Sequence, residues 1–341
     1  MNGDQLRATV LGFLAAGGVL GVLVYSLDVG ELTANLVRAE PPVLALVVGA
    51  ILLWLLAWGF ALRTVLGVLG VDIPPHLAFF VFNGAMFANN VTPFGQAGGE
   101  PVTALLISAV TDTEYERSLA AIASVDTLNF FPSIAFALLG AAYYATQATF
   151  GRRLRVATGI AVVLAVAVPV VGYLGWRNRD RLRGFVTGRL TPLVQRVARL
   201  VPGVSEPSTD TVEHRVDHFL GAIERVATDP RGLVIALSAS TLGWLCQMVG
   251  LWLAFRALDT PVDITVVMFA VPMGAIAGAT PTPGGSGFIE SVLTGLLVVV
   301  LTVPQATVGA AVILFRAAVF GVPVLLGGLV VSWIGVDVYG Q

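Results

Sequence analysis

The chain has 341 residues, of which 56% are hydrophobic and 12% are charged, and its mean hydropathy is +0.87. An average soluble domain contains about 25% charged residues, so the composition excludes an ordinary soluble protein and predicts an integral membrane protein. The formal net charge of −2 shows no excess of basic residues, and we therefore expect no nucleic-acid partner.

Six apolar runs are long enough to cross a bilayer, whose hydrocarbon core of about 30 Å requires roughly 20 helical residues. They cover residues 6–27, 42–70, 117–144, 154–176, 232–258 and 304–334. We expect a short polar turn with Asp28, Glu31 and Glu40 between the first two runs. The predicted fold class is all-α: a single polytopic transmembrane helix bundle over residues 1–341 with about six full spans.

Two further apolar regions are too short or too broken to be ordinary spans. Residues 75–91 and 99–110 would extend over only roughly 25 and 18 Å at about 1.5 Å per residue. Between them the sequence NNVTPFGQAGGEP is polar and rich in Gly and Pro, and residues 263–303 contain a similar break, ATPTPGGSGFIES. Irregular backbone at membrane depth is tolerated only inside protein or beside a wet cavity. We predict two re-entrant half-helix hairpins.

The segment 177–231 differs from the rest of the chain, because it holds ten of the nineteen Arg residues and seven acidic residues. Apolar residues recur at helical spacing over 182–197 and 212–226, which predicts amphipathic helices at the membrane surface. With the N-terminus inside, thirteen Arg residues are cytoplasmic and five are external. The positive-inside rule therefore predicts a multi-pass cell-membrane protein with both termini in the cytoplasm.

The two broken regions match each other at an offset of 190 residues. The offset pairs Thr92 with Thr282, Pro93 with Pro283, Gly95 with Gly285 and Glu100 with Glu290; it also pairs Trp54 with Trp244. The chain is therefore interpreted as two related units, residues 42–146 and 232–335. The predicted topology makes the second unit inverted, an arrangement that recurs in transporters with broken helices near the midplane.

The hairpin tips supply the candidate binding site. Glycines permit tight turns and close backbone approach, and the exposed amides at half-helix starts attract anions. The two glutamates are expected in the first turns of half-helices, where they either cap the helix or contact a cationic headgroup or carry a proton. The candidate substrate-binding residues are Asn89, Asn90, Thr92, Pro93, Gly95, Gly99, Glu100, Thr282, Pro283, Gly285 and Glu290.

Two more charges, Asp126 and Arg316, fall within predicted spans and are also related by the 190-residue offset. An unpaired charge at a helix centre costs about 2.5–3.5 kcal/mol on insertion scales, so each requires a partner. We expect Arg316 to pair with Asp126 or with a tip glutamate, either as a static bridge or as a gating pair.

The sequence shows no Ser/His/Asp set, phosphate-binding loop or metal-ligand cluster. His214 and His218 have metal-binding spacing, but acidic and basic neighbours favour a solvated helix face. Cys246 lies in an apolar run and is interpreted as a buried hydrophobic residue. We therefore expect no catalytic activity, no cofactor and no metal site.

Three motifs carry a family resemblance: TPFGQAGGEPVTALLIS, YERSLAAIASVDTLNFFP and PTPGGSGFIESVLTGLL. In this order they resemble the lysylphosphatidylglycerol synthase transmembrane, flippase-like family, over nearly the whole chain. The resemblance implies a polytopic module that moves aminoacylated phospholipid, here expected without the soluble synthase domain. Gln96, Thr103 and Thr127 stand where relatives often carry basic residues, which weakens a phosphate-clamping role there and makes Arg316 more prominent.

These observations leave three functions open. The first is translocation of a lipid or lipid-linked headgroup by alternating access at the paired tips, with membrane lipids as partners. The second is an ion-coupled carrier of a small solute. The third is a non-transporting scaffold that recruits a separate lipid-modifying or glycosyl transferase through residues 177–231.

Overall fold

The structure is a computed structural model, and it describes residues 3–92, 96–147, 209–276, 278, 280 and 282–339. The described residues form helices and connecting loops, with no strand among them. The expected span 154–176, the first amphipathic piece at 182–197, Pro93 and Gly95 lie outside this set. The helices are α1 (Gly3–Ser26), α2 (Val29–Arg38), α3 (Pro41–Val68), α4 (Pro75–Val91), α5 (Gln96–Thr111), α6 (Tyr115–Gln147), α9 (Thr209–Thr228), α10 (Pro230–Arg256), α11 (Ile264–Ile276), the 3₁₀ turn η1 (Pro283–Gly285), α12 (Phe288–Val300) and α13 (Gln305–Tyr339).

The all-helical membrane class predicted from composition is confirmed. Within the described residues, five stretches are long and apolar enough to cross a membrane, or six if the bent pair α1 and α2 counts as one span. The five are Pro41–Val68, Tyr115–Gly140, Pro230–Arg256, Pro283–Val300 and Gln305–Ser332. The fourth joins η1 to α12, so by length this half of the second hairpin also passes as a span.

The expected polar turn after the first span is wrong, because residues 29–38 form the helix α2, which meets α1 at 97°. Asp28 begins this helix, its carboxylate accepting the backbone N–H of Glu31 at 3.0 Å. Leu32 is buried with Leu27 and Ala310, so one face of α2 packs on the bundle. A capped, amphipathic sequence of ten residues thus forms a helix across the bundle end where charge alone indicated a turn.

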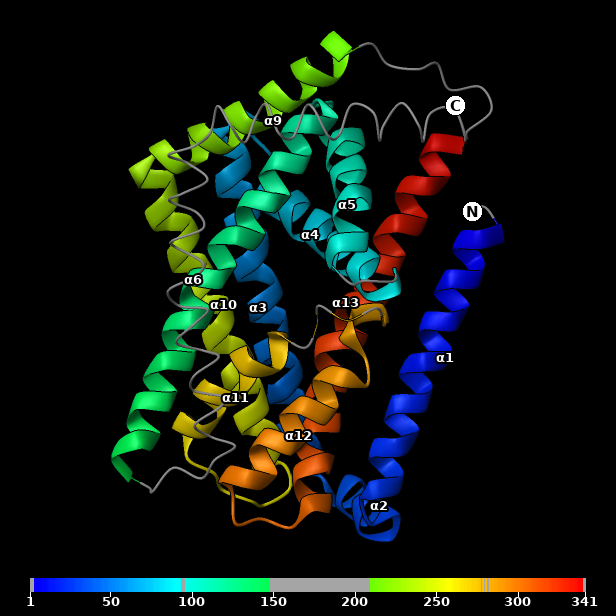
Figure 1. Cartoon of the computed structure of the whole chain (residues 1–341), viewed down its shortest axis with the longest axis vertical. Helices are drawn as coiled ribbons and strands as arrows, with labels where there is room; N and C mark the ends of the chain where they lie inside the picture. Colours follow the sequence, from blue (N-terminus) through cyan, green and yellow to red (C-terminus); the bar gives the residue numbers. More distant parts are fainter. Residues whose placement is uncertain are drawn as a thin grey trace.

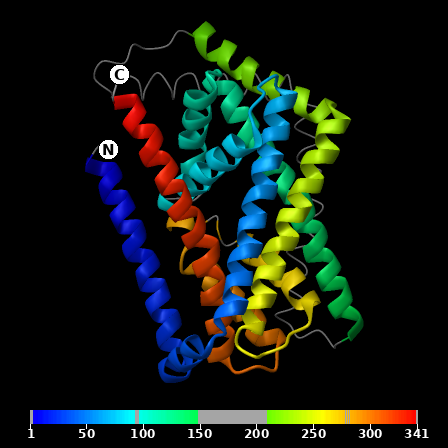
Figure 2. The same ribbon diagram turned by 180° about the vertical axis from the view of Figure 1, so that it is seen from behind.

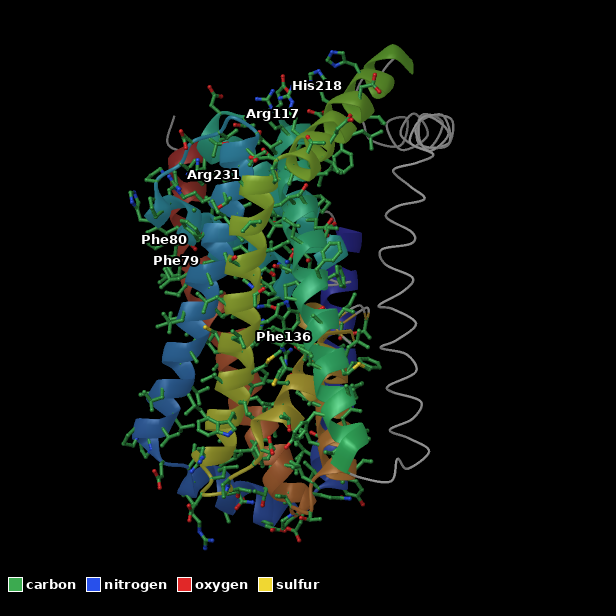
Figure 3. All side chains as sticks on the ribbon, turned by 90° about the vertical axis from the view of Figure 1, so that its left-hand side faces the viewer. Phe79, Phe80, Arg117, Phe136, His218 and Arg231 are labelled. Carbon is green, nitrogen blue, oxygen red and sulfur yellow. The ribbon has the colours of Figure 1, made fainter. Side chains whose placement is uncertain are left out.

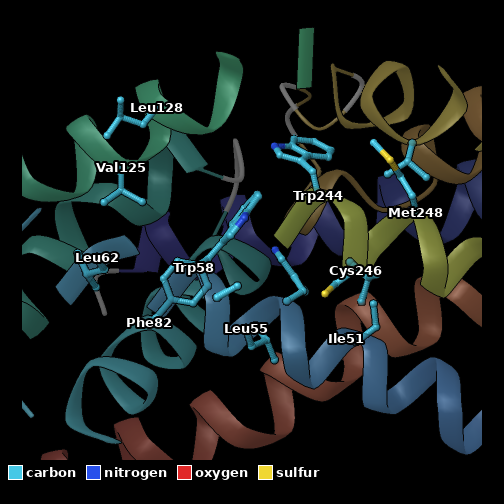
Figure 4. Packing of buried hydrophobic residues seen from close by; sticks show 14 of the residues in the cluster. Ile51, Leu55, Trp58, Leu62, Phe82, Val125, Leu128, Trp244, Cys246 and Met248 are labelled. Carbon is cyan, nitrogen blue, oxygen red and sulfur yellow. The ribbon is translucent and has the colours of Figure 1, made fainter. Parts of the chain in front are cut away.

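The centre of the bundle is the long contact between α3 and α10. Its aromatic core comprises Trp54, Trp58 and Trp244, with Trp58 edge-to-face to the other two at centroid distances of 5.4 and 5.7 Å. Figure 4 shows Trp58 and Trp244 in this core. A side chain at Gly243 would overlap the Trp58 indole, which explains the small residue there. Helix α4 packs on α3 and α11 packs on α10, so each hairpin contacts this central pair through its first helix.

The two helix hairpins occupy opposite halves of the molecule. In Figures 1 and 2, α4 and α5 lie in the half that carries α9 and both termini, whereas α11 and α12 lie in the half that carries α2. Helix α4 packs on α13, and α11 packs on α6. Helix α4 of the first hairpin also contacts η1 of the second, so the two hairpins meet inside the bundle.

Helices related by the 190-residue offset contact corresponding neighbours. The contact of α4 with α13 corresponds to that of α11 with α6, and the contact of α5 with α6 corresponds to that of α12 with α13. The surface helices follow the same rule, since α2 packs on α13 and α9 packs on α6. This correspondence extends beyond the motifs and favours the two-unit interpretation of the sequence.

The predicted second amphipathic helix is present as α9, lying across the end of the bundle (Figure 1). Ala222 and Val226 are buried, and His218 Nδ1 lies 3.1 Å from Glu114 Oε2 in the loop before α6. Figure 3 shows His218 and Arg117 together at this end. The His214 and His218 rings lie 4.2 Å apart, and no group of three or more metal-ligating residues occurs in the described part of the chain.

The start of α11 offers a test of local stability. The Asp263 carboxylate accepts the Thr265 backbone N–H at 2.9 Å and its hydroxyl at 2.7 Å. These hydrogen bonds lower the pKa of Asp263 from 3.8, so its stabilising contribution is present above that pH and is lost as the pH falls through the folded-state value. We expect Asp263→Ala to cost about 0.5–2 kcal/mol at neutral pH, measured by thermal unfolding in detergent. Asp263→Asn keeps a hydrogen-bond acceptor but cannot titrate. We expect it to remove the loss of stability that protonation of Asp263 causes at low pH.

Candidate functional site at the broken helices

The candidate site lies where the two chain breaks meet. Helix α4 ends at Val91 and contacts η1 from the other hairpin. A Cβ atom built on Gly284 would lie 2.7 Å from Asn90 Oδ1, so the Asn90 amide rests directly against the second break. Predicted residues from the two halves, far apart in the sequence, are thereby brought together.

Glu290 is the centre of the second tip. Its Oε2 accepts the Gly287 backbone N–H at 2.6 Å, and its Oε1 accepts the Arg316 Nε–H at 2.8 Å. The prediction that Glu290 lies in the first turn of a half-helix is confirmed, because α12 begins at Phe288. The carboxylate therefore caps α12 and binds a cation at the same time.

Arg316 joins this tip to the last span. Besides Glu290, it donates from Nη2 to the Gly284 carbonyl at 3.0 Å. Its exposed fraction is 8% and that of Glu290 is 6%, so the pair is desolvated and each charge depends on the other. The backbone presents that carbonyl by a turn with φ of 57° at Gly284 and 87° at Gly287, a region that favours glycine. Arg316 therefore pairs with the tip glutamate Glu290, which is one of its expected partners.

The first tip contains a different pair. The Glu100 and Asp126 side chains lie next to each other, so that two carboxyl groups interact directly. Asp126, the other partner considered for Arg316, lies beside Glu100, the glutamate of its own half. The expected first-turn position of Glu100 is wrong: α5 begins at Gln96, before the glycines, which places Glu100 one turn further in.

Close packing of α4 against α5 fixes the position of Glu100. A Cβ on Gly99 would lie 2.7 Å from the Cα and from the backbone nitrogen of Asn89. Real Cβ atoms do not approach this closely, so the two helices can touch here only if residue 99 is a glycine. The predicted role of Gly99 in close backbone approach agrees with this geometry.

Several buried polar atoms near the tips have no hydrogen-bond partner among the described residues. Asn89 and Asn90 are each only 7% exposed, yet the Oδ1 of Asn89 and the Nδ2 of Asn90 are unpaired. A buried polar atom without a partner costs about 1–3 kcal/mol, which favours a place where water or a ligand is bound. The other such atoms are in Trp54, Asn83, Thr103, Ser124, Asp126, Asn129 and Thr294.

The threonines and the proline of the motif have local roles. Thr92 Oγ1 donates to the Ala88 carbonyl in its own helix at 2.7 Å. The Thr282 hydroxyl lies 3.2 Å from that of Thr280, and Pro283 and Gly285 are buried in η1. These residues shape the tips, whereas the asparagines, the glutamates and Arg316 provide their polar groups.

Sequence reasoning missed one polar connection beside the site. Asn129, one turn beyond Asp126 in α6, accepts the Ser240 hydroxyl at 2.6 Å through Oδ1 and the Trp244 indole N–H at 2.9 Å through its backbone carbonyl. The Ser240 carbonyl in turn accepts the Trp58 indole N–H at 3.2 Å. These bonds join α6 to α10 and α10 to α3, and an asparagine in an apolar run was their only sequence signal.

Fold and site together define a polytopic helical membrane protein with a buried ion pair, Glu290 with Arg316, at the start of α12. The chain belongs to the lysylphosphatidylglycerol synthase TM region family, whose sequence profile matches residues 9–327. It is 28% identical to a UPF0104 membrane protein of Methanothermobacter thermautotrophicus, covering 97% of this chain and 95% of the relative. A UPF0104 membrane protein of Pyrococcus horikoshii is 24% identical over 83% of each chain.

Proposed function

We propose that this protein translocates a lipid or lipid-linked headgroup across the bilayer by alternating access at the two tips. The observation that carries the proposal is the meeting of the breaks, with Asn90 of one hairpin against Gly284 of the other. Broken helices near the midplane are a recurring design of transporter binding sites. Burial of ionisable side chains at that depth is expensive and marks function.

The two related units explain how the site opens alternately to the two sides of the membrane. We take the second unit to be the inverted copy of the first, supported by the corresponding helix contacts in the two halves. Each hairpin then reaches the site from its own side of the membrane. Movement of α4 and α5 would open the site towards one aqueous phase, and movement of α11 and α12 would open it towards the other.

The site suits a polar headgroup on an apolar tail. Unpaired amide atoms of Asn89 and Asn90 offer one acceptor and one donor, while apolar side chains such as Phe80, Leu105 and Phe130 are exposed on the outer surface of the helices. A headgroup held at the tips could therefore cross while its acyl chains stay in the hydrocarbon. We further propose that α9 and both termini, which share one end of the molecule (Figure 1), face the cytoplasm.

Translocation by the purified protein is the direct test. Reconstituted in liposomes, it is expected to move a fluorescent anionic, aminoacyl or polyprenyl-phosphate lipid between leaflets, measured by quenching of the accessible label. Asn90→Ala is expected to lower the initial rate about threefold to tenfold, equivalent to one hydrogen bond of about 0.5–1.5 kcal/mol to the headgroup. Asn35→Ala is the matched control, since it removes the same kind of side chain in α2, where the amide donates to Thr307 Oγ1 at 3.2 Å.

The outcomes separate the three functions. Failure to move any of these lipids, combined with uptake of a labelled small solute into the same liposomes, would replace the lipid proposal by an ion-coupled carrier. A scaffold would move neither the lipids nor the solute. It would bind its transferase through α9, and substitutions at Asn90 would not change that binding.

A further inference from the structure

The acidic pair of the first tip occupies the position that an ion pair occupies in the second. By the 190-residue offset, Glu100 corresponds to Glu290 and Asp126 corresponds to Arg316. Both glutamates contact the corresponding residue of the next long helix, α6 or α13. The second contact joins a carboxylate to a guanidinium. The first contact joins two carboxyl groups. Arg316 balances the charge of Glu290, whereas Asp126 cannot balance the charge of Glu100.

A hydrogen bond between two carboxyl groups requires a proton, because two ionised carboxylates have only acceptors. Two such groups that share a site cannot both ionise without strong mutual repulsion. Asp126 Oδ2 is buried and has no partner, and the unpaired Asn89 Oδ1 lies against Gly99, next to Glu100. Close contact of these two carboxyl groups is therefore favourable only when one of them carries a proton.

The described helices around the pair supply no cation to it. The two carboxyls interact with each other and with no described cation, and the nearest titratable residue along α6, Arg117, is more than two turns from Asp126. Helix α11 has no titratable residue. Helices α4 and α3 each have one titratable residue, His76 and Arg63, and α10 has Arg231, Cys246 and Arg256. The other titratable residues of α6 are Tyr115, Glu116, Arg117, Tyr143 and Tyr144. Those of α9 are Asp210, Glu213, His214, Arg215, Asp217, His218, Glu224 and Arg225.

We propose that Glu100 and Asp126 form a proton-binding site that couples translocation to proton movement. One proton shared by the pair holds α5 against α6. Release of that proton to water leaves two carboxylates, whose repulsion separates the first hairpin from α6 and opens its side of the site. Rebinding of one proton from the aqueous phase restores the hydrogen bond and closes it. The coupling rests on the proposed function, whereas the proton site itself can be tested without transport.

Infrared spectroscopy of the protein in lipid nanodiscs tests the proton directly. A protonated carboxyl group gives a C=O stretching band distinct from that of a carboxylate. At neutral pH we expect this band in the unmodified protein and its loss in Asp126→Asn and in Glu100→Gln. Glu290→Gln is the matched control, because Glu290 is paired with Arg316 and is expected to contribute nothing to the band. An unchanged band in both first-tip variants would overturn the proton site.

Transport separates this inference from the proposed function. In liposomes, we expect an imposed pH gradient to change the unmodified translocation rate at least threefold, and Asp126→Asn to abolish that dependence. Translocation that responds to a sodium gradient and is indifferent to the pH gradient would overturn the coupling while leaving the proposed function intact. Absence of all translocation, with the infrared band lost as expected, would overturn the proposed function and the coupling but leave the proton site standing.

Discussion

Arg316→Met is expected to destabilise the protein by about 3–5 kcal/mol, the usual cost of removing one partner of a buried ion pair. The variant keeps most of the side-chain volume but leaves the Glu290 carboxylate, 6% exposed, without its cation. It also removes the donor to the Gly284 carbonyl, which holds the turn of the second tip. Thermal unfolding in detergent, followed by tryptophan fluorescence, measures the loss.

Two controls make this result specific. Arg256→Met removes an arginine that is exposed at the end of α10 and stacks on Trp252 at 4.8 Å, and should change stability by less than about 1 kcal/mol. Adding Glu290→Gln to Arg316→Met removes the uncompensated charge while keeping an acceptor for the Gly287 N–H, and should recover most of the stability. If Arg316→Met alone were as stable as Arg256→Met, the Glu290–Arg316 ion pair would not be needed for stability.

Gly99→Ala is expected to have the second large effect. The added methyl would collide with the Asn89 backbone, so α4 and α5 must separate, which costs about 1–3 kcal/mol for overpacking. Because Glu100 is the next residue, its contact with Asp126 is displaced as well. We expect a lower unfolding temperature and at least a tenfold loss of translocation.

The matched control for this change lies in the second hairpin. Gly295 is in α12, and a Cβ there meets nothing within 4 Å. Gly295→Ala is therefore expected to be neutral or to stabilise the helix by up to about 1 kcal/mol. Equal effects of the two substitutions would contradict the close approach of α4 to α5.

Hydropathy sufficed to predict the membrane class and most long helices, because a bilayer imposes a minimum apolar length. It did not reveal α2, because its ten residues are too few to span a bilayer and mix apolar with polar side chains, and Asp28 caps their first turn. The start of α5 at Gln96 was also hidden: glycines look like a turn, and tertiary packing against Asn89 decides that they are helical.

Sequence reasoning named the charged residues at the two tips but did not fix which of them pair. The need of Arg316 for an acidic partner follows from the cost of an unpaired charge in a membrane, and the structure selects Glu290 from the candidates. The contact of Glu100 with Asp126 was not foreseen, because a pairing of two acids depends on a proton that no sequence pattern records. The bonds of Asn129 to α10 likewise depend on tertiary geometry alone.

A reversible cross-link between the tips tests alternating access most directly. Cysteines replacing Asn90 and Gly284, in a Cys246→Ala background, are positioned to form a disulfide between the two hairpins, because the native Asn90 amide touches the second break. Lipid translocation in liposomes would be measured with the bond oxidised and then reduced. We predict that translocation stops in the oxidised state and returns on reduction. Undiminished translocation by fully cross-linked protein would show that the tips do not move apart, and would contradict alternating access at this site.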